Sequence, residues 1–498
     1  MSRTRKANRT RGKNSGKQQS RGRTPKPKTN AEQLRSLLEW LLPCDGIFAG
    51  LRLHGNTTWL PRCLVCLAVC WAWAETRNVT DAFTHAVEWC GMMGHARVPV
   101  TYQGFMRALV RWTDSLMPIL WRVIHQRMEQ IAGSFWEIRG WVPIAFDGSR
   151  STAPRTPSNG KAFCAKNYGK GKTAKYRKKK TKGMRRAKNK KNRPQPQEPQ
   201  AWITLMWHMA LRLPWAWRLG PSNSSERGHV MEMLDDVEFP ENTLFCGDAG
   251  FVGYPLWDRI ISRGGHFLVR VGANVHLLSE SADFQRHNGG RVLCWPKATM
   301  DAGKPPLELR LLRVKIGKTA MWMLTSVLSA SKLSKRDIVR LYKKRWGIEV
   351  EFRGLKQTLG RAKLRCRDSR RLLAELNWSL MAMTLAELFA LREQLAPPGS
   401  QRSCEEPPGH PEKRSLANTM RALRHTLNHL PEVPERDQAL AHRLRHAVTD
   451  RYQRQSSKRA RGRPPNPDKK PLGDPKIRKL KTTEKENLDA LNSPKIAA

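Results

Sequence analysis

The spacing of hydrophobic positions changes several times along this chain, and each change predicts a different kind of structure. From 31 to about 135, apolar residues recur every three or four positions, the spacing of helices with one buried face. From 136 to 394, short apolar runs of strand length dominate, joined by a few helical segments. Helical spacing returns at 415–454, after a Pro-, Glu- and Ser-rich linker at 395–414. The pattern predicts an α/β protein in which helical regions flank a sheet-containing core.

Three further segments contain too few apolar residues to fold on their own. Residues 1–30 hold eleven Lys or Arg and no acid. An insert at 149–199 carries sixteen Lys or Arg between Lys161 and Arg193, and the tail at 455–498 is basic and rich in Pro. We expect these segments to be disordered basic arms and loops.

The best-defined single element is the helix predicted for SKRDIVRLYKKRWGIEVEFRGLKQTLG. It begins at Ser334, a suitable N-cap with Asp337 three residues on, and it ends at Gly360, a stop signal. Its two interior glycines, Gly347 and Gly354, each disfavour a helix by about 1 kcal/mol relative to Ala. One stripe of the helix is apolar and predicts packing against a core. That stripe consists of Ile338, Leu341, Ile348, Phe352, Leu355 and Leu359.

A second, polar stripe of the same helix holds Tyr342, Arg345, Glu349 and Lys356. Charged residues on a helix most often only face solvent. The spacing Y-x2-R-x3-E-x6-K, however, resembles the YREK signature of bacterial insertion-sequence transposases in the DDE class, of the insertion-sequence-four-like family. Members of that class are built around a ribonuclease-H-like catalytic core. The resemblance implies that Glu349 is a metal-binding carboxylate and that the Tyr, Arg and Lys contact transposon-end DNA.

Two apolar runs, WVPIAFDGSR and NTLFCGDAGFVGY, end in aspartates, Asp147 and Asp248. Each run predicts a buried strand that delivers an acid at its C-terminal edge. For the first run, an Asp-Gly pair such as Asp147-Gly148 after a strand is more often only a turn. The resemblance, which covers about 141–363, implies that these two residues are the first and second catalytic aspartates.

The segments around and between the two aspartates follow the order strand, strand, strand, helix, strand, which is the ribonuclease-H-like plan. The additional strands at about 275–330 resemble the β-rich insertion of YREK transposases. There the resemblance implies that Trp322 is a candidate for stacking on a base flipped out of the transposon end, although a Trp in a strand is more often part of a core. It also implies that the helical region 31–135 is the domain that binds the element's ends.

Three carboxylates from three chain segments suit Mg²⁺, a hard cation that prefers oxygen ligands. Two such ions about 3.5–4 Å apart activate the attacking oxygen and stabilise the leaving one. We therefore expect Asp147, Asp248 and Glu349 to be both catalytic and metal-binding, with two Mg²⁺ ions that Mn²⁺ replaces. The implied reaction is cleavage at transposon ends and strand transfer into target DNA, by a cut-and-paste route through a hairpin. Because two ends must meet, we expect a homodimer in the DNA complex.

The net charge of +49 independently indicates a polyanionic partner, here double-stranded DNA. Within the tail, Arg461 and Arg463 belong to an R-G-R-P motif that resembles an AT-hook, whose arginines enter the minor groove of A·T tracts. No lipidation signal, secretory segment or membrane-spanning apolar run is apparent, the longest candidate being 64–74.

The ten cysteines, in a chain without an export signal, indicate reduced thiols. Cys63 and Cys66 form a CxxC, but they lie on an apolar helix and are expected to pack in the core. Together with the resemblance to bacterial transposases, these features lead us to expect a bacterial cytoplasmic protein associated with the nucleoid.

Three alternatives use the same features differently. The first is a domesticated or inactive DNA-binding protein, and the intact set of acids counts against it. The second is a nuclease or resolvase that uses the same core, which would stop at cleavage without strand transfer. The third is an RNA-binding protein, whose binding would be unaffected by changing Glu349.

Overall fold

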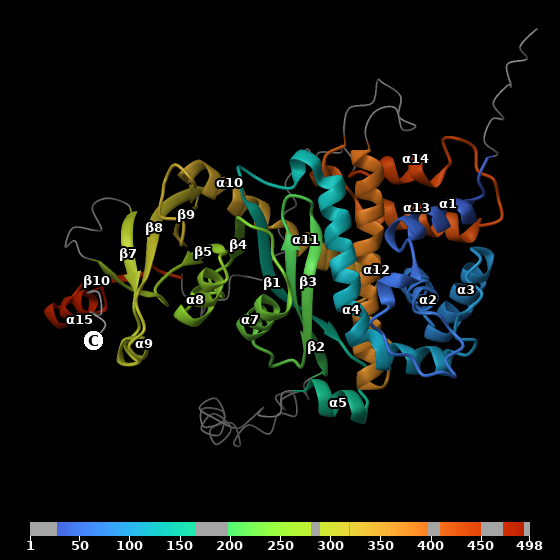
Figure 1. The fold of residues 1–498 in the computed structure, drawn as a ribbon, viewed down its shortest axis with the longest axis horizontal. Helices are drawn as coiled ribbons and strands as arrows, with labels where there is room; N and C mark the ends of the chain where they lie inside the picture. The colour runs from blue at the N-terminus through green and yellow to red at the C-terminus, as the bar shows by residue number, and fades with distance from the viewer. Residues whose placement is uncertain are drawn as a thin grey trace, which may run out of the picture.

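One ten-stranded mixed sheet forms the centre of the computed structural model (Figure 1). The structure describes residues 27–164, 198–279, 289–317, 319–396, 409–449 and 472–492. The strands are β1 (Val142–Thr152), β2 (Gln200–His208), β3 (Leu213–Gly220), β4 (Thr243–Gly247), β5 (His266–Val271), β6 (His276–Ser279), β7 (Gly289–Cys294), β8 (Leu307–Ile316), β9 (Thr319–Thr325) and β10 (Lys476–Lys479). Their order across the sheet is β10-β6-β7-β8-β9-β5-β4-β1-β2-β3.

Five of these strands make the ribonuclease-H-like core that the sequence predicts. Strands β1, β2 and β3 form an antiparallel meander, and β4 and β5 continue the sheet on the other side of β1, parallel to it. Strands β1, β3 and β4 therefore run in the same direction, because β1 and β3 are both antiparallel to β2. Their carboxyl ends consequently meet at one edge of the sheet.

The remaining strands extend this sheet and do not form a separate one. Strand β9 pairs antiparallel with β5, and β8, β7 and β6 follow in turn. The last position belongs to β10, which pairs in parallel with β6, with Lys476 opposite His276. Residues 472–492 of the predicted disordered tail are thus ordered, because β10 and the helix α15 (Thr482–Asn492) dock on the sheet edge.

Helices cover the core sheet and connect it to the rest of the chain. Helix α7 (Glu226–Asp236) packs on β1, β2 and β3, and α8 (Tyr254–Ser262) packs on β5 and on α7. Helix α10 (Lys335–Arg345) contacts β4 and β8, and α11 (Gly347–Arg353) contacts β1. Helices α4 (Tyr102–Ala132) and α12 (Ser369–Leu395) lie side by side and pack on β3 (Figure 1).

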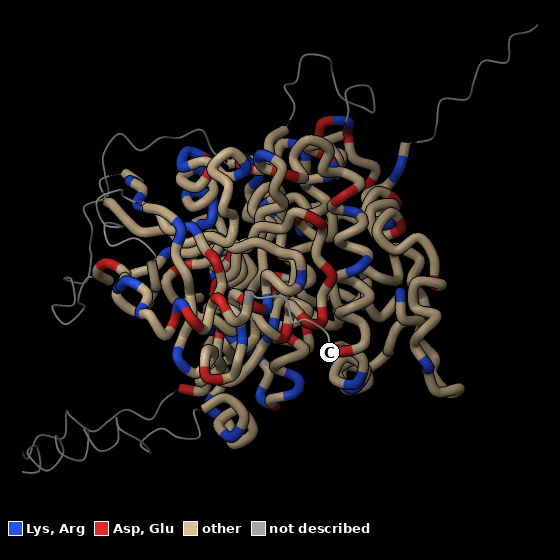
Figure 2. The backbone as a smooth tube through the Cα atoms, turned by 60° about the vertical axis from the view of Figure 1, so that its left-hand side comes forward, with Lys and Arg blue, Asp and Glu red and all other residues tan. Residues whose placement is uncertain are grey.

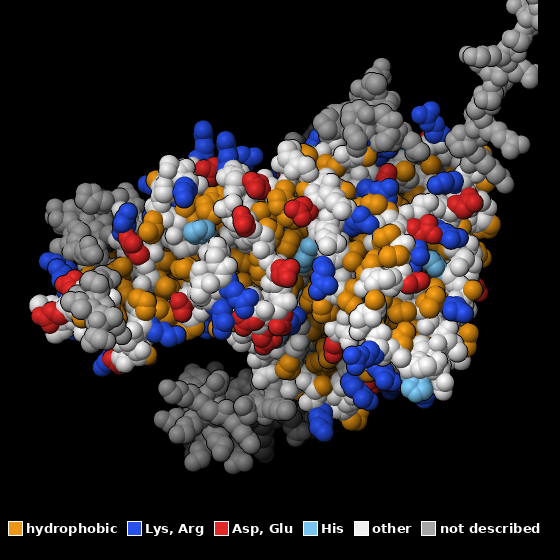
Figure 3. Space-filling model, viewed as in Figure 1, with side chains coloured by type: hydrophobic (Ala, Val, Ile, Leu, Met, Phe, Trp, Pro, Cys, Tyr) orange, Lys and Arg blue, Asp and Glu red, His pale blue; other side chains and the backbone are white. Residues whose placement is uncertain are grey.

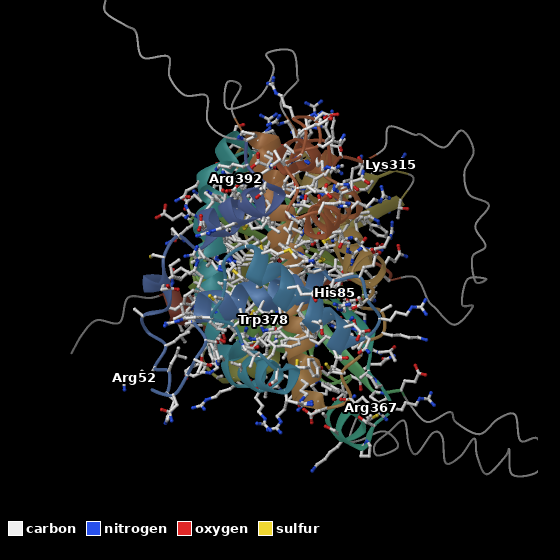
Figure 4. The ribbon with its side chains drawn as sticks, turned by 90° about the vertical axis from the view of Figure 1, so that its right-hand side faces the viewer. Arg52, His85, Lys315, Arg367, Trp378 and Arg392 are labelled. Atoms are coloured by element: carbon white, nitrogen blue, oxygen red, sulfur yellow. The ribbon has the colours of Figure 1, made fainter. Side chains whose placement is uncertain are left out.

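The N-terminal and C-terminal helices share one hydrophobic core around α12. Helices α2 (Pro61–Trp73) and α4 pack on α12, and so do α13 (Leu416–Asn428) and α14 (Leu440–Arg445). The fully buried Trp378 of α12 donates from Nε1 to Thr113 Oγ1 of α4 at 2.9 Å, within the helical layer (Figure 4). The amide of Asn30 donates to the Glu432 carbonyl at 2.9 Å, which ties the start of α1 to the C-terminal region. The layer consists of α1 (Asn30–Leu41), α2 (Pro61–Trp73), α3 (Val79–Met92), α4, α12, α13 (Leu416–Asn428) and α14 (Leu440–Arg445).

Helix α12 is long and apolar enough to cross a membrane by length and composition, with a mean hydropathy of 1.2, a feature that the sequence analysis overlooked. In the structure 89% of that apolar window is buried inside the protein. Packing against α2, α4 and β3 accounts for its apolar character on all sides.

The basic insert predicted at 149–199 is ordered at both ends. Strand β1 continues to Thr152, and α5 (Pro157–Phe163) follows with Thr156 as its N-cap. The most basic part, 165–197, lies outside the described residues. The short elements not yet mentioned are η1 (Asp45–Phe48), η2 (Gly133–Phe135), α9 (Lys297–Asp301) and η6 (Pro411–Lys413).

The CxxC thiols pack in the core of the described chain, and charged groups of both signs lie on its surface. Cys63 and Cys66 are buried free thiols, and burial raises the pKa of each, which agrees with core packing. Basic and acidic positions are interspersed over the described backbone (Figure 2). On the face shown in Figure 3, Lys and Arg side chains are likewise interspersed with Asp and Glu side chains.

Candidate active site

Asp147 and Asp248 lie level with each other at one edge of the core sheet. Strands β1 and β4 pair in parallel, with Ala145 opposite Cys246. Two residues further along each strand, the same register brings the two aspartates together, and neighbouring strands are about 4.8 Å apart. Asp147 lies within β1 and not at its end, because β1 continues beyond the last residue that pairs with β4. Asp248 directly follows β4, as predicted.

A backbone amide holds each of these carboxylates. The Gly148 N–H donates to Asp147 Oδ1 at 2.8 Å, and the Gly250 N–H donates to Asp248 Oδ1 at 2.7 Å. The loop after Asp248 is anchored by Phe251, whose buried ring lies 4.4 Å from that of Phe146 between centroids. Each aspartate thus keeps its second carboxylate oxygen for another partner.

The predicted catalytic helix is present, but it is divided into three parts. Helix α10 begins after Ser334, whose Oγ accepts from the Asp337 N–H at 3.2 Å, and α11 follows at once. A π-helical turn, η5 (Gly354–Thr358), completes the segment, which ends at Gly360 with φ of 70°. All six residues of the predicted apolar stripe are buried, as expected: Ile338, Leu341, Ile348, Phe352, Leu355 and Leu359.

The two glycines that disfavoured the helix prediction are explained by close packing. A Cβ on Gly347 would lie 2.8 Å from Cζ3 of Trp207 in β2, and closer still to Cη2. A Cβ on Gly354 would meet the end of the Leu416 side chain. Glycine therefore lets α11 approach the sheet closely, which brings Glu349 to the edge that carries the aspartates.

The Arg345 guanidinium is buried directly beside Asp147. Its side chain is 7% exposed, Nη1 lies 3.8 Å from Asp147 Oδ2, and the guanidinium carbon is 5.3 Å from the centroid of the Tyr342 ring. Nε and Nη1 make no hydrogen bond within the described residues. Buried donors without partners cost about 1–3 kcal/mol each, so this arrangement suits a site that receives an anion.

Lys356 joins the same site from the π-helical turn. Its Nζ donates to Ser149 Oγ at 2.6 Å, two residues beyond Asp147 on β1. Burial lowers the pKa of the Lys356 ammonium. Together with Arg345, Lys356 holds the helical segment 335–358 against β1, so its polar stripe faces the sheet edge and not open solvent.

The three acids influence one another electrostatically. Burial raises the pKa of Asp147, and the nearby carboxylates of Asp248 and Glu349 raise it further. The Gly148 amide and the Arg345 guanidinium act in the opposite direction. The structure therefore brings all three predicted acids into one neighbourhood.

A fourth acid, Glu226, belongs to this neighbourhood and was missed by the sequence analysis. A Cβ on Gly148 would lie 2.7 Å from Glu226 Cδ, and one on Gly250 would lie 4.0 Å from Glu226 Oε2. Burial raises the pKa of Glu226, and so do Asp147 and Asp248. An acid in the first turn of a helix is common, because it interacts favourably with the helix dipole, so the local sequence gives no signal. The order of the strands, by contrast, does indicate where Glu226 lies. Strand β3 ends at the edge that carries the two aspartates, so α7, which follows β3, begins there.

No three His, Cys, Asp or Glu side chains lie close enough to hold one metal ion, in the part of the chain that the structure describes. The acids thus face a common region without forming a closed coordination shell. Their chemistry nevertheless fits a hard divalent cation, since every donor is a carboxylate oxygen and a cation would relieve their mutual repulsion.

The structure argues against Trp322 as a base-stacking platform. Its side chain in β9 is 9% exposed, and Nε1 donates to Asp474 Oδ1 of the C-terminal segment at 2.8 Å. Trp346, between α10 and α11 beside Arg345, is by contrast 59% exposed. The local sequence does not reveal that Trp322 is covered, because its partner Asp474 is distant in the chain. The two AT-hook arginines, Arg461 and Arg463, lie outside the described residues.

Residues 142–385 match the family model described as the transposase DDE domain. The chain carries a transposase DDE domain. Its catalytic core is therefore that of a DNA transposase, and the matched segment includes all four acids at the sheet edge. No curated protein matches the chain. Among solved structures, the piggyBac transposase synaptic complex with hairpin DNA, determined by cryo-electron microscopy, is similar with a TM-score of 0.36 and 11% identity over 86% of each chain.

Proposed function

We propose that this transposase cleaves DNA at transposon ends and transfers the ends into target DNA, with Asp147, Asp248 and Glu349 as its catalytic carboxylates. The observation that carries the proposal is the parallel register of β1 and β4, which sets the two aspartates level at one edge. The glutamate comes from α11, which packs on β1. The Y-x2-R-x3-E-x6-K spacing supports membership of the YREK, insertion-sequence-four-like class.

The carboxylates are proposed to bind divalent cations, Mg²⁺ in the first place and Mn²⁺ as a substitute. A pair of bound ions would activate the attacking oxygen and stabilise the leaving one. Asp147 and Asp248 would offer the oxygens that the backbone amides leave free. Glu226 is added to this set as a fourth acid, because it lies against Gly148 at the same edge.

Arg345 and Lys356 are proposed to contact DNA phosphates beside the scissile bond. The unused donors Nε and Nη1 of Arg345 support this role, since a phosphate oxygen would satisfy them. Tyr342 supports the guanidinium through its ring. Positive charge fixed at this place also balances the charge that develops on the reacting phosphate.

Trp346 is proposed in place of Trp322 as the aromatic side chain that contacts a base. It is exposed beside the catalytic helix, and stacking on a base provides about 1–3 kcal/mol per base. Lys343 of α10 and Arg353 of α11 are also exposed, and their charges suit the adjacent phosphates.

Two copies of the chain are proposed to hold two transposon ends, in a cut-and-paste reaction through a hairpin. The basic segments, including Arg461 and Arg463 of the tail, would add phosphate and minor-groove contacts. Non-specific binding should then weaken steeply with salt.

The test compares the wild type with Glu349→Gln on a labelled duplex that carries the element's own ends. We expect cleavage and strand transfer to fall at least about a thousandfold, with DNA binding unchanged. Glu241→Gln, an exposed acid just before the end of β4 opposite to Asp248, is the matched control. Equal cleavage by wild type and Glu349→Gln would refute the assignment, and cleavage without strand transfer would favour a nuclease.

A further inference from the structure

A cavity of about 990 Å³ lies beside the catalytic edge, beginning at the loop that follows Asp248. The loop contributes Gly250, and α8 contributes Tyr254. The opposite wall comes from β6, from the segment that joins β7 to α9, and from β10. The cavity therefore lies between the core of the DDE domain and the added part of the sheet, whose strands β7 and β10 are at the left of Figure 1.

The lining of this cavity is cationic. It includes Arg227, Lys297, Lys476 and Arg478, and no Asp or Glu. Arg227 Nη1 donates to the Val252 carbonyl at 2.7 Å, which holds its side chain at the cavity wall. Lys297 and Lys476 are exposed. Such a lining favours an anionic ligand.

One wall of the cavity is built from the C-terminal segment, which lies outside the 142–385 match. Strand β10 is held to β6 by backbone pairing over four residue pairs. The Ala273 N–H also donates to the Leu472 carbonyl at 3.0 Å, and the Leu480 N–H donates to the Ser279 carbonyl at 3.1 Å. The wall is thus tied to the sheet at both ends of β10.

Side chains reinforce this docking. Leu480 is buried with Leu278, Leu293 and Trp295 in a hydrophobic cluster of its own. Arg478 donates to Glu484 Oε2 at 2.7 Å, at the start of α15. The C-terminal segment therefore has a fixed position against the cavity and is more than a flexible tail.

The size of the cavity limits its ligand. A volume of about 990 Å³ corresponds to a cube about 10 Å on a side. A DNA duplex is wider than this, since its major groove alone is about 12 Å across, so a duplex does not fit into the cavity. A short single strand does. The cavity also begins at Ala249, the residue that directly follows Asp248, so it lies next to the candidate active site.

We propose that this cavity binds a short single-stranded stretch of DNA through its phosphates, and that Lys297 from the DDE domain and Lys476 from the C-terminal strand both contact it. The identification of the strand with transposon DNA rests on the proposed function. The presence of an oligonucleotide site does not, because it follows from the cavity's charge, size and walls.

The test uses the full-length protein and a labelled, 5′-phosphorylated single-stranded tetranucleotide, with fluorescence anisotropy measured over a range of salt concentrations. The variant is Lys297→Gln combined with Lys476→Gln. The matched control removes two exposed lysines that do not line the cavity, Lys479→Gln on β10 and Lys315→Gln at the periphery (Figure 4). Ultraviolet crosslinking of the bound tetranucleotide, mapped by mass spectrometry, locates the contact.

Each phosphate contact to a single strand contributes about 0.7 to the slope of log K against log salt. We therefore expect the cavity variant to lower the slope by about 1.4 and the control to leave it nearly unchanged. Crosslinks should fall on the walls around Lys297 and Lys476. Equal slopes for the two double variants, or crosslinks confined to other parts of the chain, would overturn the proposal.

The two proposals fail separately. If Glu349→Gln retains cleavage while the cavity variant loses slope, the catalytic assignment falls and the oligonucleotide site stands. If Glu349→Gln abolishes cleavage while both double variants keep the wild-type slope, the oligonucleotide site falls alone.

Discussion

Replacing Gly347 by Ala should damage this transposase through a single methyl group. The new Cβ would lie 2.8 Å from Trp207 Cζ3 and closer to Cη2, whereas ordinary contacts begin at 3.4 Å. Trp207 is 1% exposed within the core, so its ring has little room to move. Helix α11 must then shift away from the sheet by about 1 Å, and Glu349 shifts with it.

The expected effects on stability and on activity differ in size. Overpacking destabilises the folded state by about 1–3 kcal/mol, and the higher helix propensity of Ala stabilises it by about 1 kcal/mol. The free energy of unfolding should therefore fall by about 0–2 kcal/mol. A misplacement of about 1 Å at a catalytic group costs about a hundredfold in rate, so cleavage should fall by that factor while the protein stays folded.

The assay combines urea unfolding with metal-dependent cleavage of an end-bearing duplex. Gly354→Ala is the matched control, because its Cβ meets the flexible end of Leu416 and not a rigid ring. Adding Trp207→Phe to Gly347→Ala shortens the ring and should restore part of the activity. Full activity and stability in Gly347→Ala would refute the reasoning, since the helix would not depend on this close approach.

Three further predictions concern charged groups. Burial and neighbouring acids raise the pKa of Asp147, so the folded protein loses stability as pH rises through that pKa. The variant Asp147→Asn removes this charge, so it should raise the melting temperature at neutral pH in metal-free buffer while abolishing cleavage. Mg²⁺ should raise the melting temperature of the wild type and not of Asp147→Asn, and an equal rise in both would contradict the metal assignment. Arg345→Lys should lower cleavage by about 10²-fold with little loss of stability, because the lysine ammonium cannot reproduce the planar set of guanidinium N–H donors. Unchanged cleavage kinetics would exclude a phosphate contact. Hydrogen bonding to Arg478 lowers the pKa of Glu484 to about 2, so this pair stabilises the docked C-terminal segment above the ordinary carboxyl pKa and less as pH falls toward 2. Glu484→Gln should accordingly speed hydrogen exchange in β10 at neutral pH, and unchanged protection would show that β10 docks independently of the pair.

Local sequence determined most of the secondary structure and indicated the three candidate acids, Glu349 of the signature and the two aspartates that follow apolar runs. The alternation and length of apolar runs indicated the strands, and the stripe from Ile338 to Leu359 indicated which face of the catalytic helix is buried. These features are encoded locally, because side-chain period and end signals depend on near neighbours in the chain.

Tertiary structure alone decided how these elements meet. The register of β1 and β4 sets Asp147 beside Asp248, and the direction of β3 brings Glu226 to the same edge. The return of 472–492 to the sheet buries Trp322 and completes the cationic cavity. A local pattern specifies which face of a strand is buried but not which distant strand covers it. That choice depends on the packing of the whole chain.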